Sequence, residues 1–200
     1  MINLSIKVNK MVDQNEKELI ERVLQGEKSA FREIVVNYQK LVNHIAYKMI
    51  PQETERDDIC QDVFIKVYQN LGSFQFGSKL STWIGRITYN RCLTYLEKKK
   101  PLLFEDFAEK NQTLDSLQSD VFDPEKILLS SDLSVRIRSE INLLPIKFKT
   151  ILSLYHLEEM TYDEIGKIMK LPSGTVKSYI FRGRKMLKDR LLQKYNQEDL

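Results

Sequence analysis

Glycine and proline are scarce in this chain, with 7 and 5 among 200 residues. Gly-rich phosphate loops and β-turns need both residue types, so this scarcity disfavours an α/β enzyme and a turn-rich β-sandwich. Two cysteines, Cys60 and Cys92, are too few for a disulfide framework, and two histidines, His44 and His156, leave little for a metal site. The composition therefore offers little for a metal site, and we expect no metal and no cofactor.

Long apolar runs are also missing. No stretch approaches the ~20 residues of a membrane-spanning helix, and residues 1–11 lack an apolar stretch long enough for a signal peptide. A content of 42% hydrophobic and 30% charged residues is typical of a globular protein. Together these features predict a cytoplasmic protein without membrane insertion.

Apolar residues at steps of three and four recur through most of the chain, which predicts an all-α fold. Such stripes run from Phe31 to Met49 and from Ile59 to Leu71, and another begins at Leu80. Residues 101–127 hold seven acidic and two basic residues without a sustained apolar period, which indicates a flexible acidic linker. The predicted organisation is two small helical domains joined by this linker, over residues 13–100, 101–127 and 128–192.

The C-terminal domain carries the pattern of a helix-turn-helix. Thr161 and Glu164 have the spacing of a capping box, which predicts the start of a short helix. A longer helix is expected from Ser173 to about Leu192, only a few residues after the short one ends. Two helices joined in this way are typical of a DNA-binding motif.

The net charge of +3 conceals an uneven distribution. Residues 1–100 carry +4, residues 101–127 carry −5, and residues 128–200 carry +4. Residues 79–100 contain six basic groups and one acidic group, and residues 170–190 contain seven basic groups and one acidic group. Two basic helices flanking an acidic linker indicate two nucleic-acid contacts, although each cluster alone is equally well read as a solvated helix face.

The helix expected after Ser173 has a core side and a polar side. At about 100° per residue, Ile180, Gly183 and Leu187 fall near Val176. The opposite side holds an exposed aromatic among cations, which suits a DNA major groove: Ser178, Phe181, Arg182 and Lys185. The alternative is an ordinary amphipathic helix with one exposed Phe.

Aromatic and basic residues alternate between Phe74 and Arg91. Trp83, Arg86 and Asn90 share one helix face, and a Gly-containing loop precedes them. Aromatic rings stack on unpaired bases while cations hold the backbone, so this segment suits single-strand capture. The alternative, that the aromatics belong to the core, is as good for Trp83 taken alone.

A cluster of acidic residues marks the start of the helix that contains Cys60. Asp57, Asp58 and Asp62 favour the helix dipole there. Their spacing and the lack of histidines argue against a metal site. A protein-binding surface is the better interpretation, since Phe64, Lys66 and Tyr68 follow.

Four stretches of this chain resemble bacterial RNA polymerase sigma factors of the small extracytoplasmic-function (ECF) type. They cover residues 31–38, 57–74, 79–100 and 143–187. The most specific is TYDEIGKIMKLPSGTVKSYIFRGR from Thr161, and STWIGRITYNR from Ser81 is nearly as diagnostic. The resemblance implies a promoter-specificity subunit without enzymatic activity, whose partners are core RNA polymerase and promoter DNA. An anti-sigma factor is a further candidate partner, because the family often has one.

The resemblance also assigns roles to residues. Docking on the polymerase clamp would involve Asp57, Asp58, Gln61, Asp62, Phe64 and Tyr68. Recognition of the −10 element and of a flipped base would involve Phe74, Gln75, Phe76, Gly77, Ser78, Lys79, Thr82, Trp83, Arg86, Asn90 and Arg91. Recognition of the −35 element would involve Ser173, Thr175, Lys177, Ser178, Tyr179, Phe181, Arg182 and Lys185.

Four positions depart from the family pattern. Gly166 and Gly183 stand where Ala is usual, Lys170 where a turn Gly is usual, and Tyr179 where Arg is common. Glycine within a helix costs up to about 1 kcal/mol relative to alanine. The missing Arg at position 179 puts the strength of the phosphate contacts in doubt.

Two other functions compete with a sigma factor. A stand-alone helix-turn-helix regulator would bind palindromic duplex sites without polymerase. A metal-dependent nuclease would use Asp57, Asp58 and Asp62. The loop from Phe74 to Ser78 favours the sigma factor, because a protein that reads only duplex DNA has no use for it.

Overall fold

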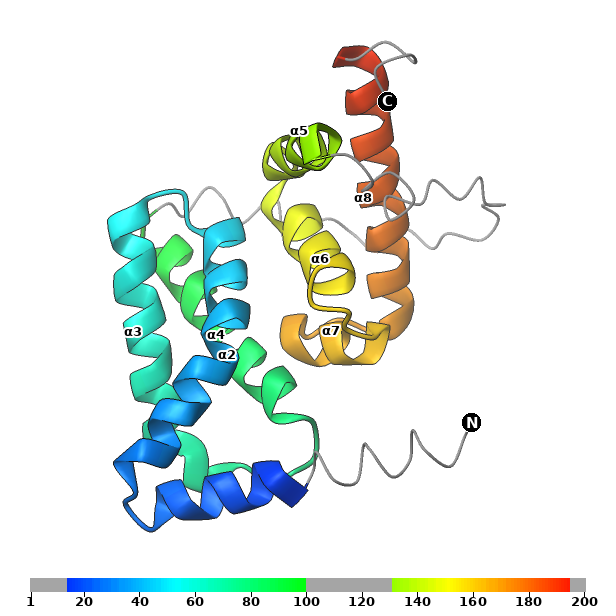
Figure 1. Cartoon of the computed structure of the whole chain (residues 1–200). Helices are drawn as coiled ribbons and strands as arrows, with labels where there is room; N and C mark the ends of the chain where they lie inside the picture. The colour runs from blue at the N-terminus through cyan, green and yellow to red at the C-terminus, as the bar shows by residue number, and fades with distance from the viewer. Residues whose placement is uncertain (1–13, 100–130, 195–200) are drawn as a thin grey trace. The chain divides into compact units, whose positions relative to one another are not determined.

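The structure is a computed structural model that describes residues 14–99 and 131–194, and the regular elements in these ranges are all helical (Figure 1). The predicted all-α class is therefore confirmed. The chain divides into two compact units, residues 1–93 and 94–200. The predicted linker over residues 101–127 lies outside the described residues, and the predicted domain limits stay predictions. None of the described helices is both long and apolar enough to cross a membrane.

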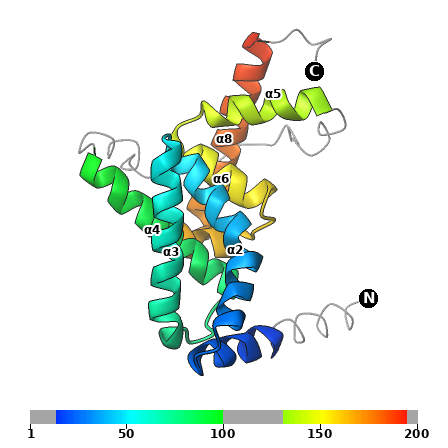
Figure 2. The same cartoon turned by 60° about the vertical axis from the view of Figure 1, so that its left-hand side comes forward.

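Unit 1 is a set of helices around an apolar core. It contains a helix over residues 14–24, α2 (Lys28–Met49), α3 (Glu53–Asn70), the short 3-10 helix η1 (Leu71–Ser73) and the greater part of α4 (Leu80–Lys99). Helices α2 and α3 lie side by side, as Figure 2 shows in blue and cyan.

The apolar spacing explains the packing of α3. Ile59, Val63 and Val67 recur every fourth residue, and each is at most 1% exposed. Helix α2 ends where Pro51 follows, because the preceding Ile50 takes the extended conformation that a residue before proline favours. The stripes predicted from Phe31 and from Ile59 thus form helices that pack together.

Unit 2 is organised around its last helix. Helix α8, which spans Ser173–Lys194, packs against three helices of the unit. These are α5 (Ser131–Asn142), α6 (Ile146–His156) and α7 (Tyr162–Met169). The residues that α8 buries include Val176, Ile180, Gly183 and Leu187, which confirms the core side expected from the helical spacing.

The turn between α7 and α8 is tight. Thr161 and Glu164 form the predicted capping box at the start of α7. Lys170 ends that helix in the left-handed conformation (φ 57°, ψ 45°), which explains why a turn glycine is usual at this position. A Cβ added to Gly166 would lie 2.6 Å from the backbone oxygen of Leu171, so the turn leaves room only for glycine there.

A buried carboxylate joins α5 to α8 in unit 2. Glu140 on α5 is 1% exposed and accepts hydrogen bonds from Lys194 Nζ (2.6 Å) and Arg190 Nε (3.1 Å) on α8. These bonds, that of Lys194 foremost, hold the pKa of Glu140 below its ordinary value although burial acts in the other direction. The contact fixes the C-terminal half of α8 to α5.

Candidate nucleic-acid interface

The loop over residues 74–79 is fastened to unit 1 by its first aromatic. Phe74 is 8% exposed and lies between two other rings, with centroid distances of 4.9 Å to Phe76 and 5.4 Å to Trp83. Its amide donates a hydrogen bond to the carbonyl of Leu71, the first residue of η1. Phe74 therefore supports the loop from beneath, and its predicted DNA contact stays a prediction.

Phe76 is the exposed aromatic of this loop. It has a left-handed backbone conformation (φ 55°), and 43% of its surface is accessible. Such a conformation is costly for an aromatic residue, and strain of this kind concentrates at functional sites. Beside it, Gln75, Gly77 and Lys79 are exposed and Ser78 is half-buried.

Helix α4 carries the rest of the predicted −10 contacts. Trp83 and Asn90 are half-buried and Arg86 is exposed, so the expected shared face is accessible. Thr82 is 2% exposed, and its predicted DNA contact stays a prediction. We call residues 74–79 together with Trp83, Arg86 and Asn90 the loop surface.

Arg91 joins two of the predicted surfaces. Its guanidinium donates two hydrogen bonds to the carboxylate of Asp62 on α3, one of them from Nε at 3.1 Å. Arg91 was predicted to contact DNA and Asp62 to bind polymerase. In this structure the two opposite charges are paired, so an outside partner of either side chain would meet a charge that is already partly compensated.

The acidic start of α3 lies on the surface. Asp57, Asp58 and Gln61 are exposed and Phe64 is half-buried. Tyr68 is 52% exposed, and its ring meets that of Phe31 edge-on with a centroid distance of 4.9 Å. Among the described residues no group of three or more His, Cys, Asp or Glu side chains could hold a metal ion.

The outer side of α8 agrees in part with the predicted −35 contacts. Lys177, Ser178, Phe181, Arg182 and Lys185 are exposed or half-buried, and we call these five residues the helix surface. The hydroxyl of Ser178 donates to the Gly174 carbonyl at 3.0 Å.

Of the residues at the start of α8 that are predicted to contact DNA, one is hydrogen-bonded to α7 and another is partly covered. Ser173 donates its hydroxyl proton to Asp163 on α7, and Thr175 is half-buried. The N-terminal end of α8 is therefore attached to the preceding helix through a side chain as well as through the turn.

Tyr179 lies at the contact between α6 and α8. It is 9% exposed, and its ring packs edge-on against Phe148 of α6 with a centroid distance of 5.7 Å. The ammonium of Lys147 lies 5.2 Å from the same ring. Tyr179 therefore belongs to the packing between α6 and α8, and its predicted contact with the −35 element stays a prediction.

Comparison with known families accounts for both units. Residues 34–101 match the family model of sigma-70 region 2, and residues 134–187 match that of sigma-70 region 4. The ECF RNA polymerase sigma factor SigW of Bacillus subtilis is 35% identical over 179 residues, which cover 88% of this chain and 96% of SigW. The chain belongs to the ECF sigma factors.

Solved structures share the fold of this sigma factor. The structure of CnrH in complex with the cytosolic domain of CnrY has a TM-score of 0.62 at 19% identity, and covers 88% of this chain and 97% of that one. The sigma factor RpoE of Bartonella quintana, solved in complex with the anti-sigma factor NepR, has a TM-score of 0.59 at 18% identity, and covers 82% and 98%.

Sequence reasoning missed a cavity on unit 2 of this sigma factor. It has a volume of about 350 Å³ and is lined by residues of α6 and α8, among them Lys147, Arg182, Lys185 and Asp189. The helical spacing places Arg182 and Lys185 on the outer side of α8, but it does not show that α6 supplies a third cation beside them. Lys147 is 4% exposed, and no sequence signal distinguishes it from a surface lysine.

Proposed function

We propose that this sigma factor binds core RNA polymerase, directs it to promoters through their −10 and −35 elements, and promotes melting of the DNA. In this proposal the acidic start of α3 docks on the polymerase. The loop surface holds the unpaired strand of the −10 element, and the helix surface reads the −35 duplex in the major groove.

The observation that carries this proposal is the loop surface. It presents the Phe76 ring, which is 43% exposed and rests on the buried Phe74, at the start of a helix that displays Arg86. Exposed aromatic rings next to cations bind unpaired bases in a way that tolerates many sequences. A regulator that reads only duplex DNA does not need such a ring, which favours a sigma factor over a stand-alone repressor or activator.

The helix surface supports the second half of the proposal. Arg182 and Lys177 can reach guanine edges or phosphates, and Phe181 can contact a thymine methyl group. The short α7 and its capped start hold α8 as the second helix of a helix-turn-helix, the element that enters the major groove in such motifs.

The binding partners and the cellular compartment follow from the same proposed function. The protein would act in the cytoplasm with the polymerase and would perform no chemistry of its own. An anti-sigma factor is part of the proposal as a regulator, since the structural neighbour from Bartonella quintana was solved with one. The nuclease alternative receives no support from the described carboxylates.

Transcription in vitro tests this proposal directly. Purified protein and core polymerase are incubated with fragmented genomic DNA, and the transcripts are sequenced. We expect discrete start sites that share sequences near −10 and −35 and that depend on the added protein. Absence of initiation on every fragment, together with absence of binding to core polymerase, would contradict the proposal.

Gel shifts with and without core polymerase separate the sigma factor from the regulator. A sigma factor should bind promoter DNA tightly only as holoenzyme. Tight binding of the free protein to palindromic duplexes would favour the regulator instead.

A further inference from the structure

The helix over residues 14–24 lies beside the loop surface, although it precedes the segment matched by the region 2 model. Lys17 Nζ is 5.4 Å from the centroid of the Phe76 ring. At the other end of the helix, Leu24 Cδ2 lies 3.5 Å from the position that a Cβ on Gly72 would occupy. Two points of this helix therefore contact the segment from η1 to the loop.

Buried apolar residues and one hydrogen bond fix the position of this helix. Leu19, Ile20 and Val23 are at most 7% exposed. The hydroxyl of Tyr38 on α2 donates to Glu16 Oε1 at 2.7 Å. Burial and this carboxylate raise the pKa of Tyr38, so the phenol keeps its proton. Lys17 is therefore attached to a helix that is held against the rest of unit 1.

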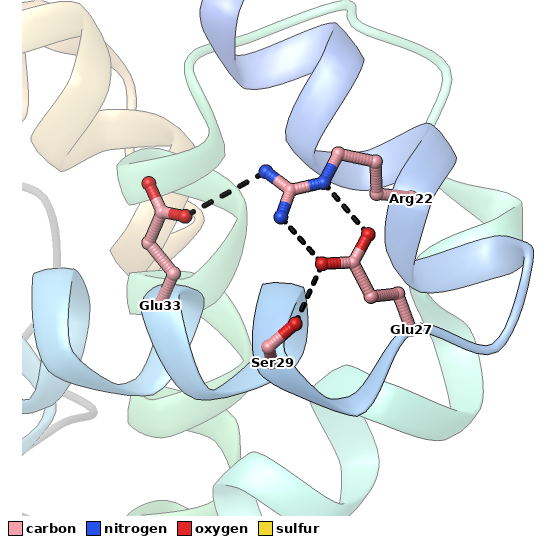
Figure 3. A network of polar contacts seen from close by, with 4 residues as sticks. All are labelled: Arg22, Glu27, Ser29 and Glu33. Atoms are coloured by element: carbon pink, nitrogen blue, oxygen red, sulfur yellow. Dashed lines mark hydrogen bonds and ion pairs between the residues drawn. The ribbon is translucent and has the colours of Figure 1, made fainter.

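A polar network sets the turn into α2 (Figure 3). Arg22 donates to both oxygens of Glu27, at 2.8 Å and 2.5 Å, and Ser29 donates to one of them at 2.6 Å. These hydrogen bonds, that of Arg22 foremost, lower the pKa of Glu27 to about 2. Because the network is exposed, it adds little to the stability of the fold, and its main effect is to orient the turn.

We propose that Lys17 completes the single-strand site, and that its ammonium binds the backbone phosphate of the nucleotide whose base contacts Phe76. This inference rests on the proposed function of the loop surface. Lys17 would be a contact contributed by the N-terminal helix, from outside the region 2 segment.

The chemistry favours a phosphate as the ligand of this ammonium. An exposed cation above a ring contributes only about 0.5–1 kcal/mol. A charge-assisted hydrogen bond to a phosphate oxygen is stronger, so the arriving strand can displace the ring contact. The neighbouring Glu16 already accepts the Tyr38 hydrogen bond, and Glu18 accepts one from Gln14, so each of these carboxylates has a partner of its own.

The test uses holoenzyme and a fluorescent forked DNA whose −10 nontemplate strand is unpaired, titrated over a range of salt concentrations. Lys17→Met keeps the length of the side chain but removes its charge. We expect about fivefold weaker binding and a salt slope smaller by about 0.7, the value for one phosphate on a single strand. Lys17→Arg should restore both. In the Phe76→Ala background, Lys17→Met should cost less, because both residues act on one nucleotide.

Lys40→Met is the matched control, because Lys40 is an exposed lysine of α2 outside the predicted contacts. An unchanged slope with Lys17→Met, or an equal fall with Lys40→Met, would overturn the inference while the proposed function stands. An equal loss on a duplex that carries only the −35 element would also overturn it. Failure of the unmodified holoenzyme to bind the forked DNA would instead contradict the proposed function.

Discussion

The loop surface and the helix surface are built in different ways. The loop surface depends on side chains that are themselves buried, since Phe74 supports Phe76 and Trp83 from beneath. The helix surface projects from one side of α8, while the other side of that helix forms the core of unit 2. In the first case a buried residue lies within the binding surface and supports its exposed residues; in the second the core residues and the binding residues lie on separate sides of one helix.

This difference has a consequence for mutation. A change to the binding chemistry of the helix surface can leave the fold intact, because few of its side chains are needed for packing. A change to the buried Phe74 of the loop surface alters the support of its neighbours. Substitutions in the two surfaces should therefore separate into those that affect stability and binding together and those that affect binding alone.

The largest effect is expected from Phe74→Ala. Removing a buried aromatic ring should lower the free energy of unfolding of unit 1 by about 3–5 kcal/mol. Promoter melting should fail in the same variant, because Phe76 and Trp83 lose their support. Urea denaturation and permanganate footprinting of the promoter measure the two effects. Phe76→Ala is the control and should cost under about 1 kcal/mol, as expected for an exposed side chain; equal costs would contradict the packing role of Phe74.

Glu140→Gln should destabilise unit 2 by about 2 kcal/mol, because a buried carboxylate loses its charge-assisted hydrogen bonds. The pKa of Glu140 is lowered by folding, so its contribution is complete above the ordinary value of 4.5 and is lost as pH falls through the folded value. The difference between wild type and variant should therefore shrink between pH 7 and pH 3 in urea denaturation.

Glu140→Gln also tests whether the core side and the binding side of α8 are independent. Glu140 contacts Arg190 and Lys194, which lie outside the helix surface. Selectivity for the −35 sequence should stay as in the wild type at temperatures where the variant is folded. Altered selectivity would show that the two sides of α8 are coupled.

Arg182→Ala should change binding without a matching loss of stability. We expect a loss of about 1–3 kcal/mol in discrimination at one −35 position, with a change in unfolding free energy near 0.5 kcal/mol. Binding of holoenzyme to a set of −35 variants measures the first. Arg138→Ala is the control, since it removes the same charge from an exposed position of α5. Unchanged selectivity would remove Arg182 from the base-reading residues.

The smallest effect is expected from Lys170→Gly. Glycine has no Cβ penalty in the left-handed conformation that Lys170 occupies, so unit 2 should become more stable by about 1 kcal/mol. Lys170→Ala removes the same charge but keeps the Cβ, and it should bring no gain. Thermal unfolding compares the two variants, and equal shifts would show that charge and not backbone strain is responsible.

The helices and their starting points could be predicted from the sequence because these signals are local. The capping box needs only Thr161 and Glu164, and the core stripe of α3 needs only an apolar residue at every fourth position. The positions of Trp83 and Arg86 on one face of α4 follow from the same periodicity.

The burial of Tyr179 and the backbone conformation of Phe76 could not be predicted in this way. Tyr179 lies about 60° from Val176 on the helix, and it is buried because α8 packs against several helices, which widens its buried arc. Phe76 is left-handed although Gly77, the residue better suited to that conformation, follows it. Both outcomes depend on contacts between segments far apart in the chain.

Gly166 limits how this sigma factor can be engineered. Replacing a helical glycine with the alanine common in the family is a standard route to higher stability, with a usual gain of about 0.4–1 kcal/mol. Here the added methyl group would meet the backbone oxygen of Leu171, so the turn would have to open before alanine could fit. The residue at position 166 and the path of the turn must change together, which makes the family consensus a poor guide at this position.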